Sequence, residues 1–233
     1  MVGVEKYTDL PEAQFAERDA GAVREHLLAL GYPSRNVVLL AGQRASRAGL
    51  AKTLETWLPN QVKASSKVLF YYSGHGAPDP RAGDAYLVPS DGDPQYLKDT
   101  AYPLARLYQK LGGLKARQVV VVLDACFSGT GGRSVLAKGT RPLVTRVESE
   151  KGLPAKVRLL AASDGDQISG TDPEQGHGLM TYHLLKALNE SKGRASLQEA
   201  FESLKSRVED AARRDNREQT PQLLPASAEP TSF

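Results

Sequence analysis

Two hydrophobic periodicities alternate along the chain. Apolar residues spaced three and four positions apart predict amphipathic helices over 16–30, 46–58, 104–111, 179–188 and 197–212. Between them lie short apolar runs bounded by Gly, Pro or polar residues, which predict strands at 36–40, 67–72, 85–88, 118–123 and 157–162. Residues 119–122 are four consecutive valines, which are apolar on both faces as a central strand requires.

This order of strands and helices predicts the fold class. Alternation of buried strands with helices indicates an α/β protein with a doubly wound, mainly parallel sheet and helices on both faces. The 233 residues are enough to bury a full core. Residues 128–156 hold many Gly and charged residues without periodicity, which predicts a long loop inside the domain.

Two chemically complementary residues follow predicted strands. His75 lies just after strand 67–72, and Cys126, the only cysteine, lies just after strand 118–123. Carboxyl ends of parallel strands share one edge of a sheet, where such folds build their sites. An imidazole can take the proton that a thiol must lose to become a nucleophile. The sequence therefore predicts a His–Cys dyad.

The segments around these residues resemble the caspase-like cysteine peptidases, and the metacaspase and bacterial branches most closely. They are Ser73-Gly74-His75-Gly76 and Asp124-Ala125-Cys126-Phe127-Ser128-Gly129. A histidine about 50 residues upstream of the cysteine is part of the caspase pattern. Further matches are Val2-Gly3-Val4-Glu5-Lys6-Tyr7, Gly176-His177-Gly178-Leu179-Met180-Thr181-Tyr182 and Gln219-Thr220-Pro221-Gln222.

The resemblance implies one caspase-like peptidase domain over 1–233, with a mainly parallel six-stranded sheet and one late antiparallel strand. Within it, 1–135 correspond to the large-subunit-like part with the dyad, 136–156 to the loop, and 157–233 to the small-subunit-like part. Caspase-like enzymes are often cut in this loop. Lys138, Arg141, Arg146, Lys151 and Lys156 offer basic cleavage positions there.

The resemblance also assigns roles at the site. His75 would be the base and Cys126 the nucleophile, and the N–H groups of Gly76 and Cys126 would form the oxyanion hole. Backbone N–H groups aimed at a developing oxyanion are a strong source of catalysis. A simpler interpretation, that Gly74 and Gly76 only permit a tight turn with positive φ, is compatible with this one.

The charge pattern predicts specificity. Asp19 and Asp124 match an acidic pocket of metacaspase-like relatives, and Ser73 completes it. Two carboxylates in a partly desolvated pocket suit a guanidinium or ammonium, so we expect cleavage after Arg or Lys. The alternative for Asp19 is a charge that favours the start of its own helix.

Other interpretations of these residues are weaker. His177, between two glycines, is the competing base, but its segment precedes a helix rather than following a strand. We expect His26 to be solvated and His183 to be a packing or surface residue. A lone cysteine is often an inert core residue, yet Cys126 lies where the chain leaves a strand. The glycines after residue 128 lack the Gly-Lys-Ser/Thr ending of a phosphate-binding loop.

Bulk properties limit the partners. A net charge of +3 without a basic stripe argues against nucleic acid. No apolar run approaches the length of a membrane span, and a single cysteine allows no intrachain disulfide and suits the cytoplasm. The chain opens inside a predicted strand, so we expect it to be part of a larger multidomain protein.

We therefore expect a cysteine endopeptidase acting on protein or peptide substrates. The alternative is a non-catalytic caspase-homologous module that binds or scaffolds partners. No cofactor or metal is expected. Calcium activates many metacaspases, and Asp91, Asp93 and Asp99 offer oxygens, but Arg133 stands where relatives carry another Asp.

Overall fold

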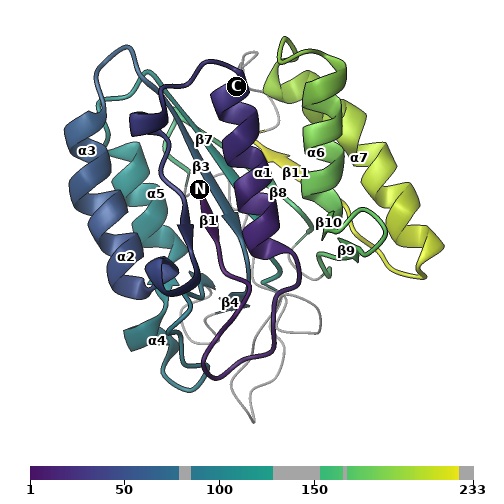
Figure 1. The fold of residues 1–233 in the computed structure, drawn as a ribbon, viewed down its shortest axis with the longest axis horizontal. Coiled ribbons are helices and arrows are strands. Elements are labelled where there is room, and N and C mark those ends of the chain that lie inside the picture. The colour runs from purple at the N-terminus through teal and green to yellow at the C-terminus, as the bar shows by residue number, and fades with distance from the viewer. Residues whose placement is uncertain (79–84, 128–152, 165–166, 226–233) are drawn as a thin grey trace.

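The computed structural model describes residues 1–78, 85–127, 153–164 and 167–225. Its centre is a six-stranded sheet in the order β11-β8-β7-β3-β1-β2 (Figure 1). In chain order its strands are β1 Val2–Gly3, β2 Leu40–Ala41, β3 Lys67–Ser73, β7 Gln118–Asp124, β8 Val157–Ala161 and β11 Gln222–Leu224. The expected α/β fold with a six-stranded sheet is confirmed.

All neighbours in this sheet are parallel except one pair. β3 and β7 pair over their full length, from Lys67 opposite Gln118 to Ser73 opposite Asp124. β11 runs antiparallel to β8 at the edge of the sheet, with Leu223 opposite Leu160. It is the late antiparallel strand that the family resemblance implied.

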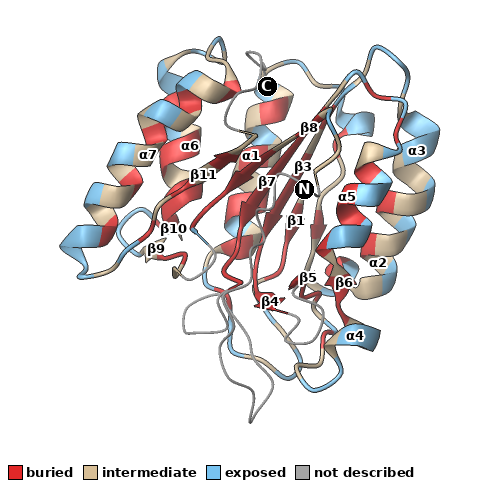
Figure 2. Ribbon diagram, turned by 180° about the vertical axis from the view of Figure 1, so that it is seen from behind, coloured by how far each residue is buried: buried red, intermediate tan, exposed pale blue. Residues whose placement is uncertain are grey.

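Helices cover both faces of the sheet. α1 (Ala16–Ala29), α6 (Leu179–Glu190) and α7 (Leu197–Arg214) pack on the face that carries Tyr71, Val120 and Val122. α2 (Arg47–Lys52), α3 (Leu58–Gln61) and α5 (Leu104–Gly112) lie at the other side, where Phe70, Tyr72 and Val121 point. Because alternate residues of a strand face opposite sides, β3 and β7 are apolar throughout. Figure 2 shows these strands as the buried centre.

Two predicted details of the first half are wrong or incomplete. Of the strand expected at 36–40, only Leu40 lies in a strand, β2; Asn36 ends the 3₁₀ helix η1 (Ser34–Asn36), and residues 37–39 have no regular secondary structure. β1 and β2 pair at two positions, Val2 with Leu40 and Gly3 with Ala41. The helix expected to end before Pro59 continues to Gln61. Its five-residue π turn η3 (Thr53–Trp57) widens the backbone just before the proline.

Smaller elements surround the carboxyl edge of the sheet. A three-stranded antiparallel sheet joins β4 (Gly76–Pro78), β5 (Ala85–Leu87) and β6 (Tyr102–Pro103). A hairpin joins β9 (Thr171–Asp172) to β10 (His177–Gly178) directly before α6. The remaining elements are η2 (Gly42–Ala45) and α4 (Leu97–Thr100).

The division into large-subunit-like and small-subunit-like parts stays a prediction, because most of its linking loop lies outside the described residues. Among the described residues, no helix is both long and apolar enough to cross a membrane.

Candidate active site

His75 and Cys126 each follow one of two neighbouring, hydrogen-bonded strands. β3 and β7 end in register, with Ser73 opposite Asp124, and the Gly74 N–H donates to the Asp124 carbonyl at 3.4 Å. Each residue of the predicted dyad lies two positions beyond this last pair. A Cβ added at Gly76 would collide with the Cys126 carbonyl oxygen and the Phe127 ring, so the two chain segments stay close beyond the strand ends.

The His75 ring is fixed by residues before α1. Its Nε2 lies 2.7 Å from the carbonyl oxygen of Pro11. A carbonyl only accepts, so Nε2 carries the proton, and Nδ1 is then the basic nitrogen of the neutral ring. The Tyr7 hydroxyl accepts from the His75 backbone N–H at 2.7 Å, and the two rings lie 4.7 Å apart. A base oriented by a third group is the usual arrangement around an activated nucleophile.

The Cys126 sulfur is buried against the backbone of Ser169. The Ser169 N–H donates a short hydrogen bond to Sγ, and Sγ lies 3.6 Å from the Ser169 carbonyl oxygen. The exposed fraction of Cys126 is 0% and that of His75 is 2%.

Glycine is required on each side of His75 for a different physical reason. Gly74 has φ of +155°, and a Cβ there would lie 2.8 Å from the hydroxyls of both Tyr7 and Tyr72. Gly76 lacks a positive φ and is needed for close approach instead, since a side chain would strike Cys126 and Phe127. The turn interpretation therefore fits Gly74 and not Gly76.

Asp19 is a buried carboxylate that joins three elements. It accepts from the Ser73 hydroxyl at 3.2 Å and from the Gly178 backbone N–H at 3.0 Å and 3.2 Å. The Nδ1 of His177 lies 2.7 Å from its Oδ1. Asp19 is in the first turn of α1, yet its side chain reaches the start of α6. The sequence offered two roles for Asp19, a pocket residue or a charge at the start of its own helix. The structure adds a third, because the Asp19 carboxylate also accepts from the N-terminus of α6.

Asp124, the last residue of β7, is a second buried carboxylate with similar partners. It accepts from the Ser169 hydroxyl at 2.7 Å, the Thr181 hydroxyl at 2.6 Å and the Thr181 N–H at 3.2 Å. Its exposed fraction is 0%. Gly178 and Thr181 both belong to the amino end of α6, whose unsatisfied N–H groups and dipole favour negative charge. The structure therefore brings Asp19, Ser73 and Asp124 together around one helix start.

The chain is similar to known proteins in sequence and in fold. The model of the caspase domain family matches residues 1–230. The chain belongs to the caspase domain family. A crystal structure of protein GSU0716 from Geobacter sulfurreducens has a similar fold, with a TM-score of 0.65 and 18% sequence identity over 96% of this chain and 90% of that one. No curated protein matches the chain.

Several residues around the caspase-domain site were not predicted as site residues. They are Tyr7, Pro11, Ser169, Thr181 and Gln219, of which Gln219 accepts from the Gly170 N–H at 2.8 Å and donates to the Ala162 carbonyl at 3.0 Å. Tyr7, Thr181 and Gln219 lie in the segments that carry the family resemblance. That resemblance was the sequence signal that could have marked them as site residues. Pro11 and Ser169 contact His75 and Cys126 through backbone atoms, which every residue type has, so the sequence carries no signal for them.

The other histidines of the caspase domain have separate surroundings. His177 pairs with Asp19, an interaction that its position between two glycines did not reveal. His183 is a packing residue on α6, where burial lowers its pKa to about 4. His26, expected to be solvated, is half-buried, and this burial lowers its pKa. The prediction for His26 was wrong because its helix packs against α6.

The acidic residues considered for calcium are engaged locally. Asp91 accepts from the Arg47 backbone N–H and Asp93 from the Gln95 N–H, each at 2.8 Å. Among the described residues, no group of three or more His, Cys, Asp or Glu could hold a metal ion. Arg133 lies outside these residues, so the calcium question stays a prediction.

Proposed function

We propose that this caspase domain is a cysteine endopeptidase that uses His75 and Cys126 and cleaves after Arg or Lys. The observation that carries the proposal is the hydrogen bond from His75 Nε2 to Pro11, on a histidine that leaves β3 beside the cysteine that leaves β7. It fixes the tautomer that a base needs.

The chemistry divides into two steps. The Cys126 thiol passes its proton to His75 Nδ1, and the thiolate adds to the scissile carbonyl to form a tetrahedral oxyanion, which the N–H groups of Gly76 and Cys126 receive. Collapse breaks the C–N bond, and the His75 imidazolium protonates the leaving amine. Water, deprotonated by His75, then hydrolyses the thioester and releases the thiol.

The preference for a basic residue rests on Asp19 and Asp124. Both carboxylates lie at the start of α6, and Ser73 between them donates to Asp19. A substrate guanidinium would take over positions now held by the His177 ring and the Ser169 hydroxyl, which are side-chain donors to Asp19 and Asp124 from outside α6 and β3. Desolvated carboxylates hold such a cation through charge-assisted bonds.

Covalent labelling tests the proposal against the scaffolding alternative. We expect a peptidyl acyloxymethyl ketone ending in Arg to add one label to the wild type, at Cys126, as measured by intact mass. The matched controls are Cys126→Ala, which has no thiol left, and His75→Gln, in which the thiol persists without its base. Equal labelling of His75→Gln and wild type would contradict an assembled dyad.

Hydrolysis is expected to be independent of calcium. Asp91 and Asp93 already accept backbone N–H groups, and a calcium ion requires six to eight oxygens, several of them anionic. The test is peptide hydrolysis in excess EGTA and in millimolar calcium, with rates expected to agree within about twofold. A calcium-dependent rate that EGTA abolishes would refute this prediction.

The loop after Cys126 is expected to be a self-processing site. Lys138, Arg141, Arg146 and Lys151 lie in residues that the structure does not describe, whereas Lys156 is part-buried at the start of β8, with its Nζ bonded to the Leu114 carbonyl. Cleavage is therefore expected between 138 and 151, where a tethered segment has a high effective concentration. Intact-mass analysis of wild type beside Cys126→Ala is the measurement. Full-length wild type that still cleaves added substrate would show that the loop is not processed.

A further inference from the structure

His177 lies against one of the two carboxylates that the proposed function assigns to the substrate. Its Nδ1 is 2.7 Å from Asp19 Oδ1, and because a carboxylate only accepts, Nδ1 carries the proton and donates. Among the described residues this is the only hydrogen bond of the ring. The side chain of His177 is 16% exposed and that of Asp19 is 0% exposed, so the ring is the member of the pair that solvent reaches.

The β9–β10 hairpin holds His177 at this place. β10 is two residues long, and its His177 pairs with Asp172 of β9. Gly176, just before it, has φ of +67°, and a Cβ there would lie 2.4 Å from the Arg18 guanidinium of α1. Rotation of the His177 side chain would break its bond to Asp19 and leave the backbone pairing of the hairpin intact.

Asp19 keeps its other partners when this bond is lost. The Gly178 N–H donates to both of its oxygens, at 3.0 Å and 3.2 Å, and the Ser73 hydroxyl donates to Oδ2 at 3.2 Å. These donors belong to the N-cap of α6 and to the last residue of β3. The carboxylate would therefore stay directed at the same point, where a cation of the substrate can replace the imidazole.

The imidazole and a basic side chain of a substrate offer Asp19 the same kind of partner. Each presents an N–H group to the carboxylate, and an Arg guanidinium adds a permanent positive charge and further N–H groups. Two donors cannot fill one position, so the substrate cation binds to molecules in which the His177 ring has moved away. When such molecules are a fraction of the population, the observed affinity falls by that fraction.

Building on the proposed cleavage after Arg or Lys, on which this inference rests, we propose that His177 is a built-in competitor of the substrate. Its side chain occupies the Asp19 side of the pocket, and the basic side chain of the substrate must displace it. Residue 177 therefore sets KM for basic substrates, whereas Asp19 and Asp124 set the preference for a positive charge.

Two variants of His177 have opposite expected effects. His177→Ala removes the competitor and should lower KM for an arginyl peptide about threefold to tenfold, the worth of one hydrogen bond. His177→Arg ties a permanent cation beside Asp19 and should raise that KM. The same peptide with Gln, which does not pair with the carboxylates, should change little in either variant. A merely structural role for His177 would make both variants worse than wild type, and for both substrates.

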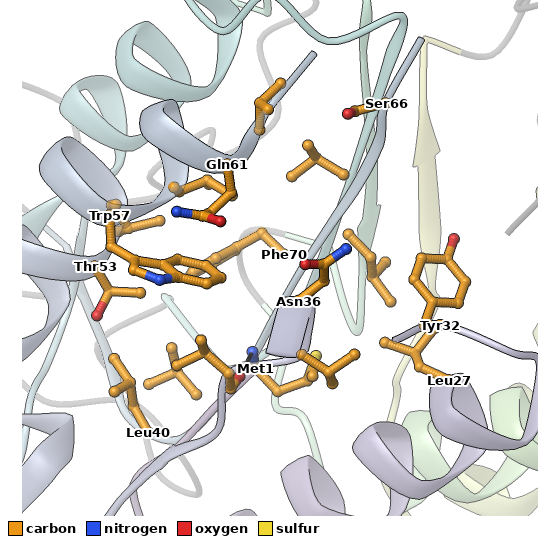
Figure 3. A pocket seen from close by; sticks show the side chains of 18 of the residues that line it. Met1, Leu27, Tyr32, Asn36, Leu40, Thr53, Trp57, Gln61, Ser66 and Phe70 are labelled. Carbon is orange, nitrogen blue, oxygen red and sulfur yellow. Dashed lines mark hydrogen bonds between the residues drawn. The ribbon is translucent and has the colours of Figure 1, made fainter. Parts of the chain in front are cut away.

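Binding without catalysis separates the competitor from the peptidase activity. The probe is N-acetyl-arginine methylamide, titrated by NMR into the full chain with Cys126→Ala, so that it is not consumed. A probe without an aromatic ring is chosen because the described residues also line a separate apolar cavity of about 290 Å³ at the first residues of β3, which an aromatic group could enter. Figure 3 shows Tyr32, Trp57 and Phe70 around that cavity.

In this background His177→Ala should tighten binding of the probe about threefold to tenfold. Its melting temperature should fall slightly, because Asp19 loses a partner, so that affinity and stability change in opposite directions. Asp124→Asn should weaken binding of the probe and confirm that it occupies the pocket.

The outcomes distinguish the two proposals. Tighter binding by His177→Ala, with no peptide hydrolysis by the chain that retains Cys126, would support the competitor and refute the peptidase. Equal or weaker binding by His177→Ala would overturn the competitor and leave the peptidase proposal intact. Failure of the probe to bind any variant would overturn the competitor together with the basic specificity, whereas the dyad would still be decided by covalent labelling.

Discussion

Peptide hydrolysis is expected to fall by on the order of 10⁴-fold or more when Cys126 is replaced by alanine, because no other residue can carry the acyl group. His75→Gln should lose a similar factor, since its amide can still donate to the Pro11 carbonyl but cannot take a proton. The double variant should be little worse than either single one, because the two residues act as a unit. The measurement is kcat/KM for an arginyl peptide substrate.

Thermal unfolding supplies the control for this result. Cys126 is fully buried and contacts Ser169 through its sulfur, so alanine removes one atom and should cost only about 1 kcal/mol of stability. His75→Gln keeps the Pro11 contact and should also remain folded. Substantial hydrolysis by purified, folded Cys126→Ala would refute the mechanism. Loss of activity together with loss of the folding transition would show only that the residues support the structure.

The fold could be predicted where local pattern and tertiary environment agree. The valines of β7 are apolar on both sides, and the structure buries both sides between helix layers, so the pattern was sufficient. Residues 37–40 are also apolar, but strand formation there depends on a partner strand, and β1 pairs only with Leu40 and Ala41. β4 and β6 are two or three residues long, which is too short for a periodic signal.

In the candidate site, too, some residues could be predicted from the sequence and some contacts could not. His75 and Cys126 could be found because each follows a recognisable strand, and because parallel strands share an edge. The contacts that orient them come from distant backbone atoms of Pro11 and Ser169, which any residue type could supply. Asp19 and Asp124 were expected to lie in one pocket. Their shared position at the start of α6 could not be predicted, because it depends on how the β9–β10 hairpin places that helix.

Specificity for a basic residue is expected to depend on Asp124. A substrate with Arg before the scissile bond should be cleaved about 10²-fold to 10³-fold more efficiently than the same peptide with Gln, because a desolvated carboxylate without its cation is costly. Asp124→Asn should remove most of this advantage, chiefly through a higher KM for the Arg substrate. The Gln substrate, which never pairs with the charge, should change little.

The comparison of two substrates separates recognition from structure. Asparagine can still accept from Thr181 through its amide oxygen, and its NH₂ can donate to the Ser169 hydroxyl, so the helix start stays supported. A structural role alone would lower hydrolysis of both substrates together and shift thermal unfolding. Recognition would lower only the Arg rate. Asp19→Asn is the matched variant, and it should likewise lower the rate for the Arg substrate and leave the rate for the Gln substrate nearly unchanged. Preferential cleavage after Asp or an apolar residue by the wild type would show that these carboxylates serve α6 and not the substrate.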